Sequence, residues 1–202
     1  MDRHDTYKTI KSPSEGLYKE KGSRFIAFAW PAGSETEIKA ILEETRRKYH
    51  DARHHSYGYV IGADSGIWRV NDDGEPSGTA GRPIMGQIRS FGLTNVLVVV
   101  SRYFGGKLLG ASGLTNAYKI AARSALSNAE IIDRIVAENF ELKFPYSSLS
   151  TVMKILKEFN VEQTEHTFDI ECRMVIKIRL SLKETVLSHL SRIENVTVDT
   201  LS

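Results

Sequence analysis

Cysteine and long apolar segments are the first things that this chain has little of. Cys172 is the only cysteine among 202 residues, so no disulfide can form within the chain. No apolar run approaches the roughly 20 residues that cross a bilayer. Residues 1–16 are polar with charges of both signs, unlike a signal or transit peptide. We therefore expect a protein of the reducing cytoplasm, without a membrane partner.

A large excess of one charge sign is also missing. The chain has 27 Lys and Arg against 25 Asp and Glu, a net charge of +2. This charge is too small to indicate a nucleic-acid binder by itself. Apolar residues make up 41% of the chain, which is typical of a globular protein. The length is compatible with one large domain or two small ones.

Glycine is absent after Gly113, and the pattern of elements changes near Asp133. The alternation and periodicity that follow predict six elements: strand 136–144, helix 148–159, strand 161–169, strand 171–181, helix 182–193 and strand 196–201. This βαββαβ order is that of a ferredoxin-like domain. We therefore expect an α+β protein with a first domain over 1–133 and a ferredoxin-like domain over 134–202.

Local signals also predict elements in the first part of the chain. Ser34 and Glu37 have the spacing of a capping box and predict a helix start. Residues 57–62 and 67–70 are expected to form a hairpin. The continuous apolar run NVLVVVS predicts a fully buried strand. The remaining expectations are a strand over 24–30, a helix from Pro83 that ends before Gly92, and a helix with Ser112 as its N-cap.

The stretch RYFGGKLLGASG, residues 102–113, contains four glycines and two cations. It is not a Walker A loop, because Ser101 stands where the first glycine belongs and Leu108 where Ser or Thr belongs. A glycine-rich entry to a helix favours an anion, and Arg102 and Lys107 are suited to a phosphate. Alternatively, the glycines serve a tight turn and close packing. Both interpretations remain open at this point.

The polar loop NDDGEPSGTAGR, residues 71–82, has three carboxylates. Asp72, Asp73 and Glu75 are weak candidates for Mg²⁺ or Ca²⁺ ligands, but they lack the spacing of an EF-hand. We favour a turn in which Asp side chains bond to nearby backbone N–H groups, and we expect neither a metal nor a cofactor. Loops of this length are often functional.

His54 and His55 are adjacent, so on a strand they point to opposite faces and cannot both chelate one ion. No H-E-x-x-H and no G-x-S-x-G motif is present. We expect one histidine to bind a phosphate or a carbonyl group and the other to pack. Aromatic residues beside cations, at 102–104 and 68–69, either stack on bases or belong to the core.

Five segments in order resemble the IMPACT/YigZ family: KGSRFIAFAW, HHSYGYVIG, NDDGEPSGTAGRPI, NVLVVVSRYFGGKLLG and GLTNAYKIAARSAL. The resemblance is strong over residues 18–128, and the rest looks like the small domain of bacterial YigZ-type members. It implies a first domain with the fold of the second domain of a small-subunit ribosomal protein, domain IV of elongation factor G and the GHMP kinases. It implies a second domain similar to domain V of elongation factor G. Eukaryotic relatives are associated with restraining the starvation control of translation.

The resemblance also implies a site, although the family has no established catalytic residues. Carried over position by position, this site comprises Arg24, His54, His55, Asp72, Asp73, Glu75, Arg82, Arg102, Tyr103, Phe104, Gly105, Gly106 and Lys107. The chain departs from the usual pattern at four positions: Ser56 for cysteine, Asn71 for serine, Ser112 for glycine and Asn116 for arginine. Losing that arginine lowers the positive charge beside the glycine loop. We expect loops 71–82 and 102–113 to meet in space.

Three functions are compatible with these features. The favoured one is a non-catalytic, cytoplasmic regulator or accessory factor of translation, which binds RNA, the ribosome or a translation-control protein. An alternative is an enzyme that acts on a small phosphorylated or nucleotide substrate through the glycine loop at a helix N-terminus. Against it, the G-L-G-S-S-A loop of the GHMP kinases is missing. A third is a protein-binding adaptor.

Overall fold

The computed structural model describes residues 5–167 and 169–201. The chain divides into two compact units, one formed by residues 7–134 and the other by residues from 135 onward together with Asp5 and Thr6. Each unit has its own hydrophobic core and a mixed α/β composition. Among the described residues, no helix combines the length and apolarity that a membrane span requires.

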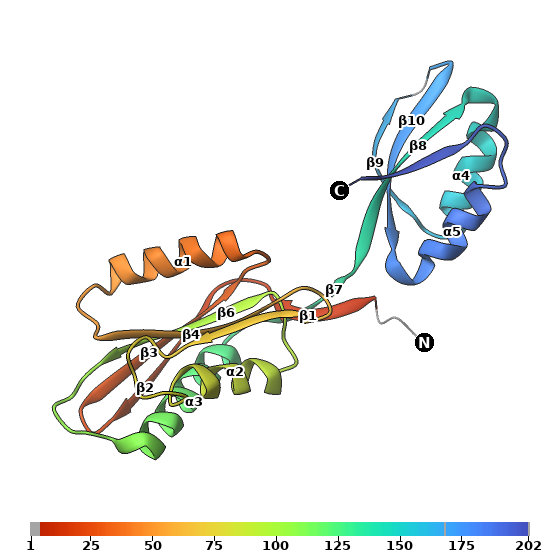
Figure 1. Ribbon diagram of the computed structural model, residues 1–202. Coiled ribbons are helices and arrows are strands. Elements are labelled where there is room, and N and C mark those ends of the chain that lie inside the picture. The colour runs from red at the N-terminus through yellow and green to blue at the C-terminus, as the bar shows by residue number, and fades with distance from the viewer. Residues whose placement is uncertain (1–4, 168, 202) are drawn as a thin grey trace. The chain divides into compact units, whose positions relative to one another are not determined.

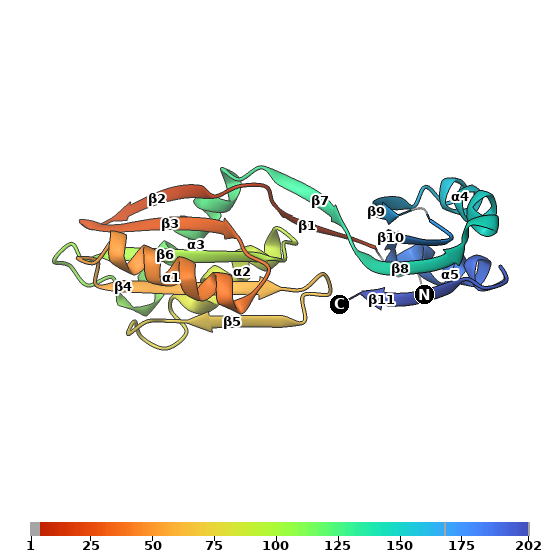
Figure 2. The same cartoon turned by 90° about the horizontal axis from the view of Figure 1, so that it is seen from above.

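The first unit is built on a five-stranded antiparallel sheet with helices on both faces. The strand order is β2-β3-β6-β4-β5, and β1 pairs separately with β7. Helix α1 covers one face, and α2 and α3 cover the other (Figure 1; Figure 2 shows the strand order). The elements are β1 (Thr6–Ile10), β2 (Ser14–Glu20), β3 (Ser23–Pro31), α1 (Glu35–Lys48), β4 (His54–Ile61), β5 (Ile67–Asn71), α2 (Gly81–Ser90), β6 (Val96–Tyr103), α3 (Gly110–Ser127) and β7 (Ile131–Ile135).

Strand β6 lies at the centre of this sheet, and its sequence reflects burial on both faces. Val96, Val98 and Val100 pack in the core under α2 and α3, whereas Leu97 and Val99 pack in the core under α1. A strand covered on both sides reads as a continuous apolar run rather than an alternation. The expected buried strand is therefore confirmed.

The start of one helix was predicted correctly and the start of another was not. Ser34 caps α1 by accepting a hydrogen bond from the Glu37 N–H at 3.2 Å, as the capping box predicts. Helix α3 begins at Gly110, with Leu109 as N-cap and no side-chain cap, so the prediction of Ser112 as N-cap is wrong. The helix begins earlier than predicted, closer to the glycine loop, so Ser112 lies in its first turn.

Strands β1, β2 and β7 were not predicted. Thr9, Ile10 and Gly16 are the only buried residues of these three strands, because each strand lies at an edge or in a two-stranded ribbon. Edge strands carry charged residues that obscure the period-two pattern. The hairpin β4–β5 and the strand β3 were predicted, with shorter bounds than the structure has.

The second unit has the element order βαββαβ that the sequence predicts. Its antiparallel sheet has the strand order β11-β8-β10-β9, and α4 and α5 pack on one face (Figure 1). Cys172, Met174, Ile176 and Ile178 of β10 point into the core as expected, whereas Leu180 falls after the strand. The elements are β8 (Ala137–Pro145), a 3₁₀ turn (Tyr146–Ser148), α4 (Leu149–Glu158), β9 (Glu162–Thr167), β10 (Glu171–Arg179), a second 3₁₀ turn (Leu180–Leu182), α5 (Lys183–Leu190) and β11 (Thr197–Leu201).

Candidate functional site

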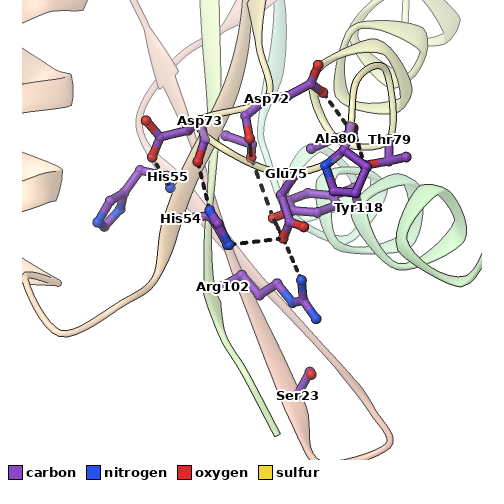
Figure 3. Close-up of polar contacts among 12 residues, drawn as sticks. Ser23, His54, His55, Asp72, Asp73, Glu75, Thr79, Ala80, Arg102 and Tyr118 are labelled. Carbon is purple, nitrogen blue, oxygen red and sulfur yellow. Dashed lines mark hydrogen bonds and ion pairs between the residues drawn. The ribbon is translucent and has the colours of Figure 1, made fainter. Parts of the chain in front are cut away.

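The candidate residues gather at one end of the five-stranded sheet. Strand β3 begins there at Ser23, β4 begins there at His54, and β6 ends there at Tyr103. In the register, Arg24 lies opposite Tyr103 and His54 lies opposite Arg102. The loop after β5 and the glycine loop after β6 leave the sheet at this same end, so the antiparallel order of the strands brings the two motifs together (Figure 3).

Glu75 is the buried centre of this end of the sheet. Its Oε1 accepts hydrogen bonds from Arg102 Nη1 at 2.7 Å and from the Tyr118 hydroxyl at 2.8 Å (Figure 3). The side chains of Glu75 and Arg102 are 3% and 7% exposed, so the ion pair is withdrawn from water. A buried charge requires such a partner, because an isolated one is strongly destabilising. The contact joins loop 71–80 to β6 and α3.

Arg102 is placed by its position on β6. It follows Val96, Val98 and Val100 in the alternation, so its side chain enters the face that α3 covers. Its guanidinium carbon lies 5.4 Å from the Phe25 ring centroid and 5.6 Å from that of Phe104. A planar guanidinium stacks well on aromatic rings. Arg102 therefore fixes the loop from the interior, where its side chain is buried against Glu75.

Two further groups border Glu75. Burial raises the pKa of Tyr118 above its ordinary value, and the Glu75 carboxylate acts in the same direction, so the hydroxyl remains a donor. His54 Nδ1 lies 2.7 Å from the carbonyl oxygen of Asp73. Because a carbonyl only accepts, Nδ1 must carry the hydrogen. The other ring nitrogen, Nε2, lies 3.9 Å from Glu75 Oε1.

Asp72 caps helix α2 from a distance in sequence. Its carboxylate accepts hydrogen bonds from the N–H groups of Gly78, Ala80 and Gly81 at 2.8, 3.0 and 2.8 Å. Burial by itself would raise the pKa of Asp72, but these three N–H groups and nearby Arg82 together hold the pKa below its ordinary value. Two of the N–H groups at the start of α2 that would attract an external anion, those of Ala80 and Gly81, are thus occupied by the chain itself.

Asp73 ties the same loop to the other face of the sheet. Its carboxylate accepts hydrogen bonds from the His55 N–H and from Arg46 Nη2, both at 2.7 Å. The Asp73 N–H donates to Asn71 Oδ1 at 2.7 Å, and Asp73 has a φ of 48°. This is a side-chain turn of the kind that the sequence predicts. Asn71, one of the departures from the family pattern, therefore supports the bend.

The two histidines point to opposite faces, as adjacent strand residues must. His54 lies on the face of Glu75, whereas the His55 ring lies on the α1 side, with Nδ1 2.9 Å from Ser101 Oγ. Burial lowers the pKa of His55 below its ordinary value. The three loop carboxylates also diverge toward separate partners. Within the part of the chain that the structure describes, no group of three His, Cys, Asp or Glu side chains is placed to hold a metal ion.

The glycine loop packs tightly on the β2–β3 turn. A Cβ atom at Gly105 would lie 1.9 Å from the carbonyl carbon of Gly22, so no other residue fits there. The Gly105 N–H donates to Ser23 Oγ at 3.1 Å, and Gly106 has a φ of 83°. Close packing at Gly105 and left-handed backbone at Gly106 and at Gly110, whose φ is 70°, therefore account for three of the four glycines. Lys107, which follows them, is exposed.

Exposed cations and one aromatic ring surround this buried framework. Arg24 lies 4.7 Å from the Tyr103 ring centroid, and Arg53 lies 6.0 Å from that of Phe104. Phe104 is 41% exposed. We call the exposed residues Arg24, Arg53, Phe104 and Lys107 the cationic rim. Arg82 is exposed nearby, beside Gly78.

Sequence reasoning placed Tyr118 only in the apolar stripe of its helix, and did not select Ser23, Arg46, Arg53 or Ser101. The sequence could have indicated a polar role for Tyr118, since it is the one hydroxyl-bearing side chain in a buried stripe of alanine and leucine. Ser101 and Arg102 could have been recognised as buried polar residues, since they continue a buried apolar strand. Nothing in the sequence distinguishes Arg46, because it looks like any other solvent-exposed charged residue of a helix.

Residues 21–126 match the family model described as the Impact N-terminal domain. The chain belongs to the IMPACT family. The IMPACT family member YigZ of Escherichia coli is 36% identical over 138 residues, which cover 67% of this chain and 68% of YigZ. A crystal structure of a protein described as hypothetical has 26% identity and a TM-score of 0.72, and covers 98% of both chains.

A further solved structure with sequence similarity to this chain is that of Yih1, which is described as a two-domain translational regulator. It is 28% identical, with 60% of this chain and 47% of Yih1 covered and a TM-score of 0.36. The similarity of the overall fold to a solved structure therefore rests on the protein with the TM-score of 0.72.

Proposed function

We propose that this IMPACT family protein is a non-catalytic accessory factor of translation that binds RNA, including RNA on the ribosome, through the cationic rim. A role in translational control is what the family resemblance implies. We also propose that the first unit corresponds to the domain IV type of elongation factor G and the second to its ferredoxin-like domain V type, and that the protein works in the cytoplasm.

The observation that carries the proposal is the contrast between the buried and the exposed residues at the end of the sheet. Asp72, Asp73 and Glu75 are each bonded within the chain, to a helix N-terminus, to Arg46 and to Arg102. These acids therefore build and fix a surface. That surface offers a partner the cations and the half-exposed Phe104 ring, beside the Asp51 carboxylate that accepts a hydrogen bond from Tyr103.

Such a composition suits a single-stranded nucleic acid. Arginine and lysine bind phosphate groups by charge-assisted hydrogen bonds, and an exposed aromatic ring stacks on a base of any sequence. Arg24, Arg53 and Phe104 lie on or beside three neighbouring strand ends, β3, β4 and β6. Neighbouring strands are about 4.8 Å apart, so these residues form a contiguous row that an extended strand of RNA can follow.

The proposal is tested by fluorescence anisotropy with a labelled single-stranded RNA, and by co-sedimentation with ribosomes, over a series of salt concentrations. For Arg53→Ala/Lys107→Ala we expect binding about tenfold weaker at low salt. The slope of log K against log salt should fall by about 0.7 for each lost phosphate contact. The matched control is Lys39→Ala/Arg47→Ala, which removes one lysine and one arginine from the exposed side of α1.

Two results would overturn the proposal. One is the absence of RNA and ribosome binding by the wild-type protein at low salt. The other is an equal loss of binding in the rim variant and in the α1 control. A thermal-shift screen with nucleotides and Mg²⁺ tests the alternative enzyme, since a ligand at a hundred times its dissociation constant stabilises the fold by about 2.7 kcal/mol.

A further inference from the structure

A separate pocket lies on the α1 face of the first unit, where the C-terminal part of α1 passes over β2 and β3. Its volume is about 160 Å³. Aromatic rings of Phe28, Trp30 and Tyr49 form its walls, and three charged residues of β2 and α1 line it as well: Glu15, Glu44 and Lys48. None of these residues takes part in the cationic rim or in the contacts of Glu75.

The size of the pocket limits its occupant. Sites for small molecules and cofactors usually measure about 300–1,000 Å³. A pocket of 160 Å³ suits one long side chain, which is how protein partners commonly anchor themselves. Arginine, tryptophan and tyrosine are the residues that most often act as such anchors.

The aromatic walls favour a cation. The rings of Phe28 and Tyr49 are 4.9 Å apart, and the ammonium group of Lys48 lies 5.3 Å from the Tyr49 ring centroid. The position of Lys48 shows that this ring already accepts a positive charge on its face. The indole Nε1 of Trp30 is a hydrogen-bond donor that is buried without a partner among the described residues, so the attraction for a cation comes from the ring faces and not from this nitrogen.

The charges point the same way. Two carboxylates and one ammonium group line the pocket, so its net charge is negative. Within residues 5–167 and 169–201, neither the Glu15 nor the Glu44 carboxylate forms an ion pair or accepts a hydrogen bond. Both are therefore available to an external cation.

We propose that this pocket receives an arginine side chain of a partner protein. A guanidinium group stacks flat on aromatic rings and presents a fork of N–H donors to carboxylates, and a lysine ammonium group does neither. Phe28, Trp30 and Tyr49 supply the rings, and Glu15 and Glu44 supply the carboxylates. The pocket thus gives the protein a second contact point, distinct in chemistry from the RNA-binding rim.

The test uses the two tryptophan indole N–H signals in an NMR spectrum, assigned with Trp68→Phe. The probe is N-acetyl-Gly-Arg-Gly-amide, added up to about 10 mM so that millimolar dissociation constants are detected. We expect the Trp30 signal to shift in a saturable way while the Trp68 signal stays in place. The citrulline tripeptide, which has the same shape without the charge, should bind at least about tenfold more weakly.

Two variants locate the contact. Glu15→Gln/Glu44→Gln should weaken the arginine peptide about tenfold, whereas Glu43→Gln, next to Glu44 on α1 but outside the pocket, should leave the affinity unchanged. The inference is overturned if the Trp30 signal does not shift, or if the citrulline or lysine peptide binds as tightly as the arginine peptide. An equal loss of affinity in Glu43→Gln would overturn it too.

Discussion

At the scale of single residues, the buried Glu75–Arg102 ion pair distinguishes this site from an ordinary surface loop with charged side chains. Both partners are more than nine-tenths buried, and Tyr118 donates to the same carboxylate oxygen. Breaking a buried pair on one side leaves an uncompensated charge, whereas replacing both partners removes the need for either. A single substitution of Glu75 or Arg102 should therefore destabilise the protein more than the pair as a whole stabilises it.

Arg102→Met removes the cation and keeps most of the side-chain volume. We expect it to lower the free energy of unfolding by about 3–5 kcal/mol, because Glu75 stays buried with only Tyr118 as a donor. Glu75→Gln/Arg102→Met should lose less than the sum of the two single variants. Urea denaturation followed by tryptophan fluorescence measures all four proteins of the cycle. Strictly additive losses would contradict the buried pairing.

At the scale of elements, the acidic side chains of loop 71–80 connect several strands and helices by hydrogen bonds. Asp72 caps α2, Asp73 holds the start of β4 and the last turn of α1, and Glu75 holds β6 and α3. One loop thus contacts both faces of the sheet. Its glycines and acids serve this bracing, and the length of the loop follows from the number of elements that it reaches.

Asp72→Asn tests the cap on α2. The charge-assisted cap should stabilise the protein by about 0.5–2 kcal/mol over the variant at neutral pH. The pKa of Asp72 is lowered in the folded protein, so its stabilising contribution is present above the ordinary value of about 3.9 and is lost as the pH falls through the folded value. The stability difference should therefore be constant from about pH 7 to 5 and shrink below about pH 4.

Chemical denaturation at a series of pH values measures this difference. Asp64→Asn is the control, since Asp64 is exposed in the β4–β5 turn and accepts a hydrogen bond from the N–H of nearby Gly66. A gap between wild type and Asp72→Asn that grows as the solution is acidified would contradict the assignment, because its sign would be that of a group with a raised pKa.

At the scale of the whole molecule, the described residues of the two units have separate hydrophobic cores. The first unit packs on both faces of β6, under α2 and α3 and under α1, and the core of the second unit is formed by β8, β10, α4 and α5. Trp30 and Trp68, the two tryptophans of the sequence, both belong to the first unit. Tryptophan fluorescence therefore follows the first unit alone, whereas far-ultraviolet circular dichroism follows both.

Leu142→Ala creates a cavity in the second core, where Leu142 is fully buried. We expect it to destabilise that unit by about 2–5 kcal/mol. The circular dichroism transition should then begin at lower urea concentration while the tryptophan transition keeps its midpoint. Val98→Ala, in the first core, should shift the tryptophan transition instead. Equal shifts of both signals in Leu142→Ala would show that the chain unfolds as one cooperative unit.

Much of the fold was predictable because its signals are local. A capping box needs residues three apart, and the buried strand β6 and the alternation in β10 are read within ten residues. The prediction of Ser112 as a cap is wrong for a related reason, since the start of α3 depends on how the glycine loop packs against Gly22. Strands β1, β2 and β7 have neither the continuous apolar run of a strand that is buried on both faces nor the alternation of a strand that is buried on one face.

The sequence by itself determined the βαββαβ order of the second unit and the buried strand at the centre of the first sheet, and through the family resemblance it offered a candidate site that lacked Tyr118 and Arg53. Only the tertiary structure decided what each site residue does. Glu75 lies 27 positions from Arg102 and 43 from Tyr118, so their contact depends on how strands and helix pack rather than on any local pattern. Burial in that packing turned an apparent phosphate ligand, Arg102, into the partner of Glu75, because a buried carboxylate is stable only beside a cation.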